Sequence, residues 1–478
     1  MPIGVLDRLL LLFAAIYIAV LPMANTMALR NVALLAVLVL LALVSIRVPA
    51  QWWLGISSAW LIPLALWVAY LCLFPLIAED SAGAWRNLGQ IWYRSILALV
   101  AGAGVAVVLA RYAGLVTTFH VGLLTVVPLV IHLGLVAFKA YEISGIPWNY
   151  WGRETHHADL GYAAGHAVVL FAVSAALALK RERRRLVAFA LIAAAILSVT
   201  IAHSRGGLGF ALLGLFLVFA VDLMVSGARK RTRYIAILVS GAAAIVLVVV
   251  FASRSDDRWV RMADRLAGGF YGDALQIQCE GNAKIERELT EKFGSGQRTA
   301  DLVESIRNGD GARIVLMRAG LRLAELHPWG LDGSRQAYQL RLKEYCPNPA
   351  AFQISHTHNG WLDTVLSLGW IGAGLYLLVL VNFLRLGIKG LRAGGEGIEW
   401  AYVLVVLSLF WILRGLTDSV YRDHQLEMQG FVLAYAAVAL KLRSRPGLNG
   451  DAAEGAPVPD CVSGACGKIV HRIRISRP

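Results

Sequence analysis

The chain has 478 residues, 58% of them hydrophobic, and its mean hydropathy is +0.62. A soluble globular protein of this length would not be so apolar throughout, so the composition excludes that class. The formal net charge of +14 invites a nucleic-acid interpretation. The basic residues are, however, clustered in short connections between apolar runs. This placement favours contact with anionic membrane lipids and no binding of nucleic acid.

Long apolar runs recur along the chain, and a membrane helix needs roughly 20 consecutive apolar residues. No run shows the alternation of a membrane β-strand. We therefore predict an all-α polytopic membrane protein with about twelve transmembrane helices. The first run could also be a signal peptide, but the apolar run that follows at once favours an uncleaved helix. The predicted helices lie near 9–24, 31–46, 54–77, 93–110, 115–137, 159–179, 186–203, 207–225, 234–252, 359–384, 399–417 and 425–441.

Basic clusters set the predicted orientation; they lie at 180–185, 229–233, 385–392 and 441–445. With about twelve spans, all of them fall on the side of the N-terminus, which the positive-inside rule identifies as the cytoplasm. The predicted organisation is helices one to nine in 1–252, a large extracytoplasmic loop in 253–357, helices ten to twelve in 358–445, and a cytoplasmic tail in 446–478. The tail is rich in Gly, Ala and Pro, so we expect it to be disordered.

The loop 253–357 is long enough to hold structure of its own, and a loop of this length is usually functional or disordered. Its centre, 281–305, is polar. The segment 309–326 has one apolar face and is followed by Pro328 and Gly330, which predicts a helix that ends there. The loop is therefore predicted to be partly helical.

Cys279 and Cys346 bracket the middle of this loop. In an oxidising compartment such a pair can form a disulfide, and two free thiols are the alternative. A bond would close a long loop and stabilise it by a few kcal/mol in the chain-entropy model. The sequence leaves the choice open.

Arg205 lies in a tight predicted outer turn with Gly206 and Gly207. Arginine is unusual on that side, and it is costly near a membrane core. Snorkelling to lipid phosphate is the simple interpretation. The glycines let backbone N–H groups approach a ligand, and the following helix N-terminus favours anions. The pattern therefore favours a phosphate-binding role.

Arg313, Arg318 and Arg322 all lie on the predicted helix of the outer loop, and the last two are one turn apart. Three arginines on one extracytoplasmic helix could form an anion-binding face. The alternative is a solvated face balanced by Glu325 and other loop acids. Both interpretations remain open for Arg318 and Arg322.

His356 and His358 lie where the polar loop ends and an apolar run begins. Imidazole titrates near pH ~6.5, so it can accept or donate a proton at ambient pH. Residues two apart share a face on a strand but point about 200° apart on a helix, so we expect only one of them to face a given site. Asn359 is predicted to cap or orient the helix that begins there.

A second outer cluster contains Arg153, His156 and His157. It could bind substrate or anchor the end of the following helix. Two histidines with nearby acids could also suggest a metal, but no firm ligand spacing is present, so we predict no metal site. The chain has no Walker P-loop, no convincing Rossmann fingerprint and no Asp-x-Asp sequence. A substrate that is already activated and already outside is therefore expected.

Together these features resemble O-antigen ligases, which belong to the wider O-antigen ligase/polymerase superfamily of bacterial polysaccharide enzymes. The resemblance rests on the topology, the single large loop before the tenth span, and the order of the local motifs. Those motifs are the Ser204-Arg205-Gly206 turn, the helix that begins at Arg313 and ends in His327-Pro328-x-Gly330, Gly333, and His358-Asn359-x-x-Leu362 followed by Gly369-x-x-Gly372.

The resemblance implies a fold similar to other polyprenyl-phosphate glycosyltransferases of the GT-C-like type. It implies transfer of O-antigen polysaccharide from undecaprenyl diphosphate to a sugar hydroxyl of lipid A–core, at the periplasmic face of the bacterial inner membrane, without a cofactor. The matching functional positions are His358, Arg205 and Arg313, although the extra His356 leaves open which imidazole acts. We expect His358 to take the acceptor proton and both arginines to bind the diphosphate, in a displacement that inverts the anomeric carbon.

O-antigen polymerase is the nearest alternative, with the same donor and a carrier-linked glycan as acceptor. A protein O-oligosaccharyltransferase would differ only in its acceptor. A transporter of lipid-linked glycans would place charged residues at the membrane midplane, whereas the polar groups here gather at the predicted outer interface. A structural scaffold would leave the pattern of Arg205, Arg313 and His358 unexplained.

Overall fold

The computed structural model describes residues 4–23, 25–46, 48, 59–110, 112, 116–152, 156–177, 182–225, 250, 266–281, 283–308, 310–346, 356–419, 421 and 423–444. The regular elements in this part of the chain are all helices. Nearly all of the predicted span at 234–252, the tail from 446 onward and Arg153 lie outside the described residues.

Seven of the described helical stretches are long and apolar enough to cross a membrane. They are α2 (Met27–Ser45), α5 (Ser81–Gln90) with α6 (Trp92–Ala110), α9 (His157–Leu177), α10 (Glu182–Ile201), α11 (Arg205–Val225), α19 (Gly360–Ala393) and α20 (Ile398–Gly415). An eighth span results if α7 (Thr118–Thr125) and α8 (Val127–Ile143), which meet at a 40° bend, are taken together. The protein is therefore a polytopic helical membrane protein.

These helices alone do not give the predicted count of about twelve spans. The first predicted run forms α1 (Val5–Val20), which has only 16 residues. The run predicted at 54–77 contains α4 (Ile62–Leu73), a helix of 12 residues between the 3-10 turns η1 (Ala59–Leu61) and η2 (Phe74–Leu76). The last run forms α21 (Asp423–Arg443), whose ends are polar and charged.

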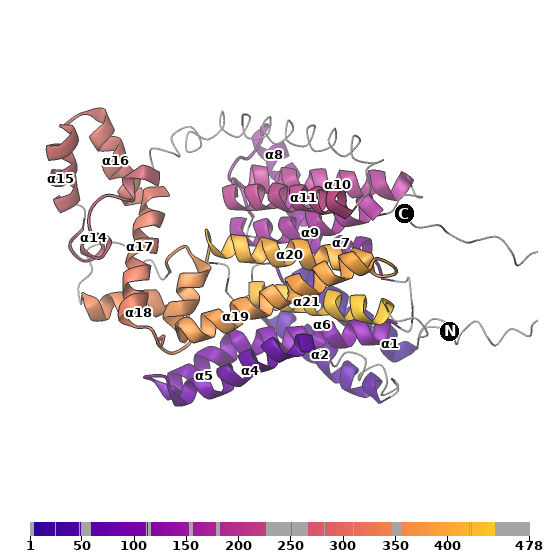
Figure 1. Ribbon diagram of the computed structural model, residues 1–478. Coiled ribbons are helices and arrows are strands. Elements are labelled where there is room, and N and C mark those ends of the chain that lie inside the picture. The colour runs from indigo at the N-terminus through magenta and orange to yellow at the C-terminus, as the bar shows by residue number, and fades with distance from the viewer. Residues whose placement is uncertain are drawn as a thin grey trace, which may run out of the picture.

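The long helices pack side by side with their axes roughly aligned (Figure 1). α21 packs along α6, α10 and α11 pack on α9, and α19 packs on α20. The central helix is α9, in which every residue from Asp159 to Val173 is buried. Such all-round burial requires small residues where helices approach, because side chains at a tight crossing hold the backbones apart.

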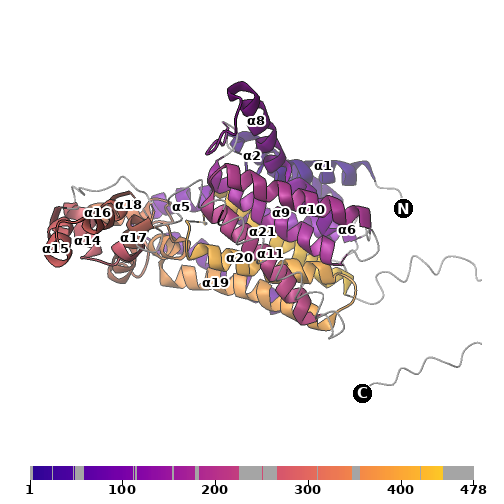
Figure 2. The same cartoon turned by 90° about the horizontal axis from the view of Figure 1, so that it is seen from above.

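The segment 266–346 forms a separate helical unit at one end of the bundle, which we call the loop unit (Figures 1 and 2). Its helices are α14 (Ala274–Glu280), α15 (Ala283–Phe293), α16 (Gln297–Asn308), α17 (Asp310–Leu326) and α18 (Ala337–Tyr345). It has its own apolar core, in which the best-buried side chains are Leu289, Ile306, Leu316, Leu323 and Tyr338. The centre of this unit was expected only to be polar, but it holds α15 and α16. α17 agrees with the predicted helix at 309–326 within a residue.

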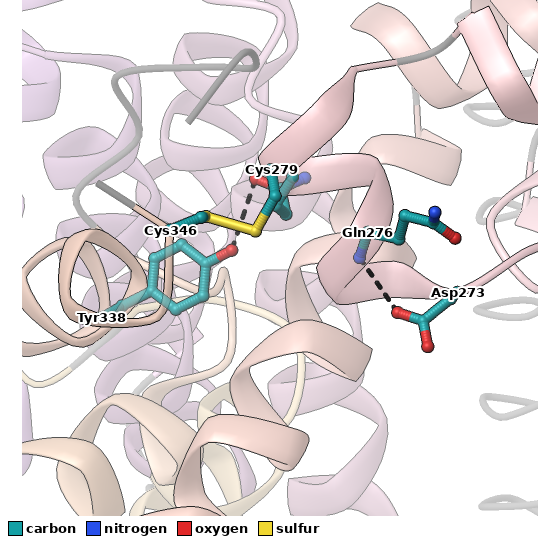
Figure 3. Close-up of a disulfide and its surroundings, with 6 residues drawn as sticks. Asp273, Gln276, Cys279, Tyr338 and Cys346 are labelled. Carbon is teal, nitrogen blue, oxygen red and sulfur yellow. Dashed lines mark hydrogen bonds between the residues drawn. A yellow bond between two sulfur atoms is a disulfide. The ribbon is translucent and has the colours of Figure 1, made fainter. Parts of the chain in front are cut away.

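Cys279 and Cys346 form a disulfide that joins the end of α14 to the end of α18 (Figure 3). Their Cα atoms are 5.6 Å apart. Beside the bond, the Tyr338 hydroxyl donates to Oε1 of Gln278 at 3.4 Å. The disulfide therefore ties the first and last helices of the loop unit together.

Replacing both Cys279 and Cys346 by alanine is expected to lower the unfolding free energy of the loop unit by about 4 kcal/mol in the chain-entropy model. The reason is that the bond closes a loop with a sequence separation of 67 residues. Limited trypsin digestion of purified protein at rising temperature measures the loss of protection. Cys72→Ala is the control, because this cysteine is free and exposed on α4. Equal protection of the double variant and the control would contradict the prediction.

The loop unit is bonded to the membrane bundle where α19 is kinked at Gly369. Gly369 has φ +76° and contacts the backbone around Gly330, which has φ +82°. The Trp370 N–H donates to the Pro328 carbonyl at 3.0 Å, and two N–H groups just after Gly330 donate to the Ser367 carbonyl at 3.2 and 3.0 Å. The end of α17 is thereby fixed to the first turns of α19.

Gly369→Ala is expected to destabilise the fold strongly. A Cβ at this position would lie 2.7 Å from the carbonyl carbon of Trp329. The backbone conformation, φ 76° and ψ 171°, is also one that only glycine adopts readily, and such strain costs about 1–3 kcal/mol by itself. Gly374→Ala on the same helix is the matched control, because an added Cβ meets nothing within 4 Å there. Thermal unfolding in detergent should show a clear decrease in Tm for Gly369→Ala alone, and equal Tm values would contradict the prediction.

Candidate functional site

Several helix ends meet at the end of the bundle that faces the loop unit. They are the first turns of α9, α11, α17, α19 and α21 and the last turn of α20. Direct bonds join them in pairs: Arg205 to Asp310, the Gly360 N–H to the Asp418 carbonyl, and His424 to Asp159. These junctions bring together residues that are far apart in the sequence.

Arg205 is the first residue of α11, and its side chain is 20% exposed. Nη1 and Nη2 donate to the two carboxylate oxygens of Asp310 at 3.1 and 3.0 Å. Asp310 is the first residue of α17, where the helix dipole favours a negative charge. This two-bond ion pair holds the guanidinium between α11 and the loop unit with a fixed orientation.

Arg313 lies one turn further along α17 and is exposed. Within the described part of the chain, its guanidinium makes no hydrogen bond or ion pair. Its charge and that of Asp418 both act on the imidazole of His157, so Arg313 faces the first turn of α9. One turn beyond Arg313, the sulfur of Met317 lies 3.7 Å from Nδ2 of Asn359. Arg313 therefore lies on the face of α17 that looks toward the histidine turn.

The histidine turn consists of residues 356–359, and both of its flanks are fixed. Nδ2 of Asn359 donates to the Leu416 carbonyl at 3.0 Å. Oδ1 of Asn359 accepts from the Leu362 N–H at 3.0 Å, so Asn359 caps α19 as predicted. On the other flank, the N–H and hydroxyl of Thr357 both donate to Oδ1 of Asp363 at 2.8 Å.

Between these fixed residues, His358 has φ +58°, a left-handed conformation that turns the chain sharply. The rings of His356 and His358 consequently lie against each other, with centroids 4.5 Å apart. The geometric premise for expecting only one of them to face a given site does not hold. It assumed a strand or a helix, and the left-handed residue makes the segment neither.

Arg318 and Arg322 lie on the same helix as Arg313 but make different contacts. The Arg318 guanidinium donates to three backbone carbonyls of 269–272 at 2.8 to 3.3 Å. These bonds give it a structural role inside the loop unit. Arg322 is 69% exposed and pairs with Glu325 at 2.7 Å, as a solvated helix face would. The structure therefore brings Arg313, and neither of these two, toward the histidine turn.

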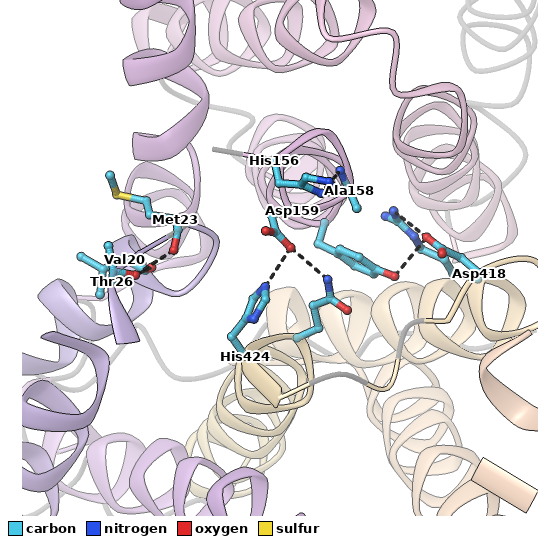
Figure 4. A network of polar contacts seen from close by, with 11 residues as sticks. Val20, Met23, Thr26, His156, Ala158, Asp159, Asp418 and His424 are labelled. Carbon is cyan, nitrogen blue, oxygen red and sulfur yellow. Dashed lines mark hydrogen bonds and ion pairs between the residues drawn. The ribbon is translucent and has the colours of Figure 1, made fainter. Parts of the chain in front are cut away.

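His156 and His157 lie at the start of α9, with ring centroids 4.1 Å apart. One turn on, Oδ1 of Asp159 accepts from Nε2 of His424 at 2.8 Å and from the Gln425 amide at 3.0 Å. Figure 4 shows Asp159 pointing from α9 toward His424 at the start of α21. This cluster anchors two helix ends beside the arginines. Among the described residues, no group of three or more His, Cys, Asp or Glu forms a metal-binding cluster.

Arg414, in the last turn of α20, was not identified from the sequence. Its side chain is 1% exposed, and its guanidinium carbon lies 3.5 Å from the centre of the Tyr162 ring. Nη2 is 3.5 Å from a carboxylate oxygen of Asp418, while Nε and Nη1 have no hydrogen-bond partner among the described residues. Gly161 allows this approach, because a Cβ there would lie 3.0 Å from Nη2 and 2.7 Å from Cα of Gly207. A buried arginine thus lies next to the turn that carries Arg205.

The fold and this site define a multi-pass helical membrane protein with a cationic site and a pair of imidazoles at one end of its bundle. Residues 190–377 match the family model described as O-Antigen ligase, and this match supports membership of the O-antigen ligase superfamily. Members of this family are glycosyltransferase-like enzymes, ligases or polymerases, that act on lipid-linked glycans. The matched range contains Arg205, Arg313 and both histidines but ends before Arg414. No curated protein matches the chain.

Proposed function

We propose that this protein is an O-antigen ligase of the bacterial inner membrane. It transfers O-antigen polysaccharide from undecaprenyl diphosphate to a sugar hydroxyl of lipid A–core. In this proposal the bundle, 1–252 and 358–445, lies in the membrane, the loop 253–357 is periplasmic and the tail is cytoplasmic. The single observation that carries the proposal is that the family-matched segment brings Arg205, Arg313 and the histidine turn to one end of the bundle.

Arg205 and Arg313 bind the diphosphate of the donor. Guanidinium remains charged at all relevant pH values and matches phosphate oxygens with two parallel N–H donors. Arg205 is already oriented by Asp310, and Arg313 has no partner to give up among the residues that the structure describes. The first turns of α11 and α17 add N–H groups and helix-dipole charge to the same place. Two positioned guanidinium groups could then stabilise the leaving diphosphate without a divalent metal.

His358 is the general base. Its imidazole takes the proton of the acceptor hydroxyl as the oxygen attacks the anomeric carbon of the donor sugar. The bond from that carbon to the diphosphate oxygen breaks, and undecaprenyl diphosphate leaves with the bonding electron pair. One displacement inverts the anomeric carbon and forms no covalent enzyme intermediate. A trapped glycosyl-enzyme would contradict this mechanism.

The test is transfer by the purified protein in liposomes that contain undecaprenyl-diphosphate-linked glycan and lipid A–core, with EDTA or with added Mg²⁺. The expected product is glycan on lipid A–core at the same rate in both conditions. Growth of the glycan on its lipid carrier would instead make the protein a polymerase. Glycan on an added acceptor protein would make it a protein O-oligosaccharyltransferase, and loss of transfer in EDTA would overturn the metal-independent mechanism.

A further inference from the structure

A polar cavity of about 470 Å³ lies beside the histidine turn. The end of α5, the start of α6, the segment 333–336 and the first turns of α19 form its walls, and His356 contributes to one of them. The volume is within the range of about 300–1,000 Å³ that is typical of small-molecule sites. Arg205, Arg313 and Arg414 do not line it, so it is separate from the cationic site described above.

The cavity walls carry mostly neutral hydrogen-bonding groups. The amide side chains of Gln90 and Gln336 and the hydroxyl of Ser367 line it, and these three groups have no partner among the described residues. Its two permanently charged side chains, Arg335 and Asp363, have opposite signs, and Asp363 is occupied by Thr357 and by the Ser419 hydroxyl. Groups that both donate and accept, with little net charge, match the hydroxyls of a sugar and do not match a phosphate or a cation.

Two aromatic residues complete the walls. Trp92 is 2% exposed and Tyr421 is 8% exposed, and both line the cavity. Nε1 of Trp92 and the hydroxyl of Tyr421 have no hydrogen-bond partner in the described part of the chain, although such buried groups usually find one. Burial raises the pKa of Tyr421 well above its usual value, so its hydroxyl stays protonated and the residue stays neutral. A ring with an apolar face and polar edges fits walls of this kind.

The position of the cavity indicates which sugar it would hold. Its wall residue His356 touches the ring of His358, and its other walls include the end of α5 and the start of α6. The cationic site lies instead on α9, α11 and α17, and α9 and α11 pack on each other and on α20. The histidine turn therefore stands between a neutral cavity and a cationic site. A ligand in the cavity would present its hydroxyls to the base from the side away from the diphosphate.

We propose that this cavity binds the acceptor sugar, as a neutral pyranose unit of the core oligosaccharide. The proposal rests on the ligase function above. Gln90 and Gln336 form hydrogen bonds with hydroxyls at the outer edge of the sugar, and Ser367 of α19 forms one with a further hydroxyl. The walls at Trp92 and Tyr421 contact the sugar ring. Binding here orients one hydroxyl toward His358.

The test compares Gln90→Trp, which fills the cavity, and Gln336→Ala, which removes one hydrogen-bonding group. Gln297→Trp is the matched control, because Gln297 is an exposed helical residue of the loop unit away from the cavity. One measurement is the Kd of lipid-free core oligosaccharide for the whole protein in nanodiscs, without donor. The other is the KM for lipid A–core and for the lipid-linked donor in the transfer assay.

We expect Gln90→Trp to raise the oligosaccharide Kd and the acceptor KM at least tenfold. For Gln336→Ala we expect an increase of about fivefold, the effect of one lost hydrogen bond. The donor KM and the control variant should stay within twofold of wild type. If Gln90→Trp leaves the oligosaccharide Kd unchanged, or raises only the donor KM, the cavity is not the acceptor site even though transfer persists. If oligosaccharide binds and depends on Gln90 but no transfer to lipid A–core occurs, the sugar site stands and the ligase function fails.

Discussion

Replacing His358 by alanine is expected to lower the turnover of glycan transfer by about 10²–10⁴-fold, the usual contribution of a positioned general base. A sugar hydroxyl is a weak nucleophile, and in the proposed mechanism no other group at the turn takes its proton. Because the diphosphate is bound by arginines from α11 and α17, the donor KM should change by less than threefold. Steady-state kinetics with both substrates varied separates the two parameters.

His356→Ala is the comparison variant, because it tests whether the base is His358 or the neighbouring His356. Its ring lies 4.5 Å from that of His358 and belongs to the wall of the neutral cavity. We expect this variant to keep turnover within about tenfold of wild type and to act mainly on the acceptor KM. If His356→Ala abolishes transfer while His358→Ala remains active, the base is His356 and the assignment must be exchanged.

Arg313→Lys is expected to lower the rate of transfer by about 10²-fold or more, although it conserves the charge. Loss of one well-placed donor to a developing anion costs about 10²–10³-fold in enzymes of known mechanism, and lysine cannot provide the two parallel N–H groups of a guanidinium. Arg313 has no ion pair or hydrogen bond within the described residues, so the substitution should leave the fold intact. Transfer rates and Tm measured on the same preparations test both statements.

Arg322→Lys is the matched control for this substitution. It lies on the same helix, is 69% exposed and is paired with Glu325. An exposed pair of this kind contributes little to stability, so the variant should behave as wild type. If Arg313→Lys were as active as Arg322→Lys, Arg313 would be a surface charge and the diphosphate would have to bind elsewhere.

The membrane helices were the easiest part of the fold to predict, because a long apolar run is compatible with few structures other than a membrane helix. The run predicted at 159–179 is α9 at His157–Leu177, and that at 399–417 is α20 at Ile398–Gly415. The helices of the loop unit were harder. In α15, Ile285 and Leu289 follow a helical spacing and are buried, but the many charged residues between them concealed the pattern.

Some residues of the candidate site could likewise be predicted from the sequence, and others could not. Arg205 could be predicted as a candidate because arginine in a short turn expected on the outer side contradicts the positive-inside rule, and Arg313 because it lies on a helix expected on that side. Arg414 could not be predicted from the sequence, because it lies at the end of an ordinary apolar run. Its contacts with Tyr162 and Gly161 form only when α9 and α11 pack against α20. The left-handed turn at His358 could not be predicted either, because histidine adopts that conformation only in a small fraction of cases.

The burial of Arg414 has a consequence for the ionic-strength dependence of donor binding. Mobile ions screen exposed charges over a distance of about 8 Å at physiological salt, but they screen buried charges much less. Under the proposed function, the attraction between Arg313 and the diphosphate should weaken as salt is added. Arg414, which is 1% exposed and stacked on Tyr162, contributes a positive charge beside the turn of Arg205 that added salt screens far less. Donor affinity should therefore decrease with added salt only to a plateau, and the remaining affinity should depend on α20.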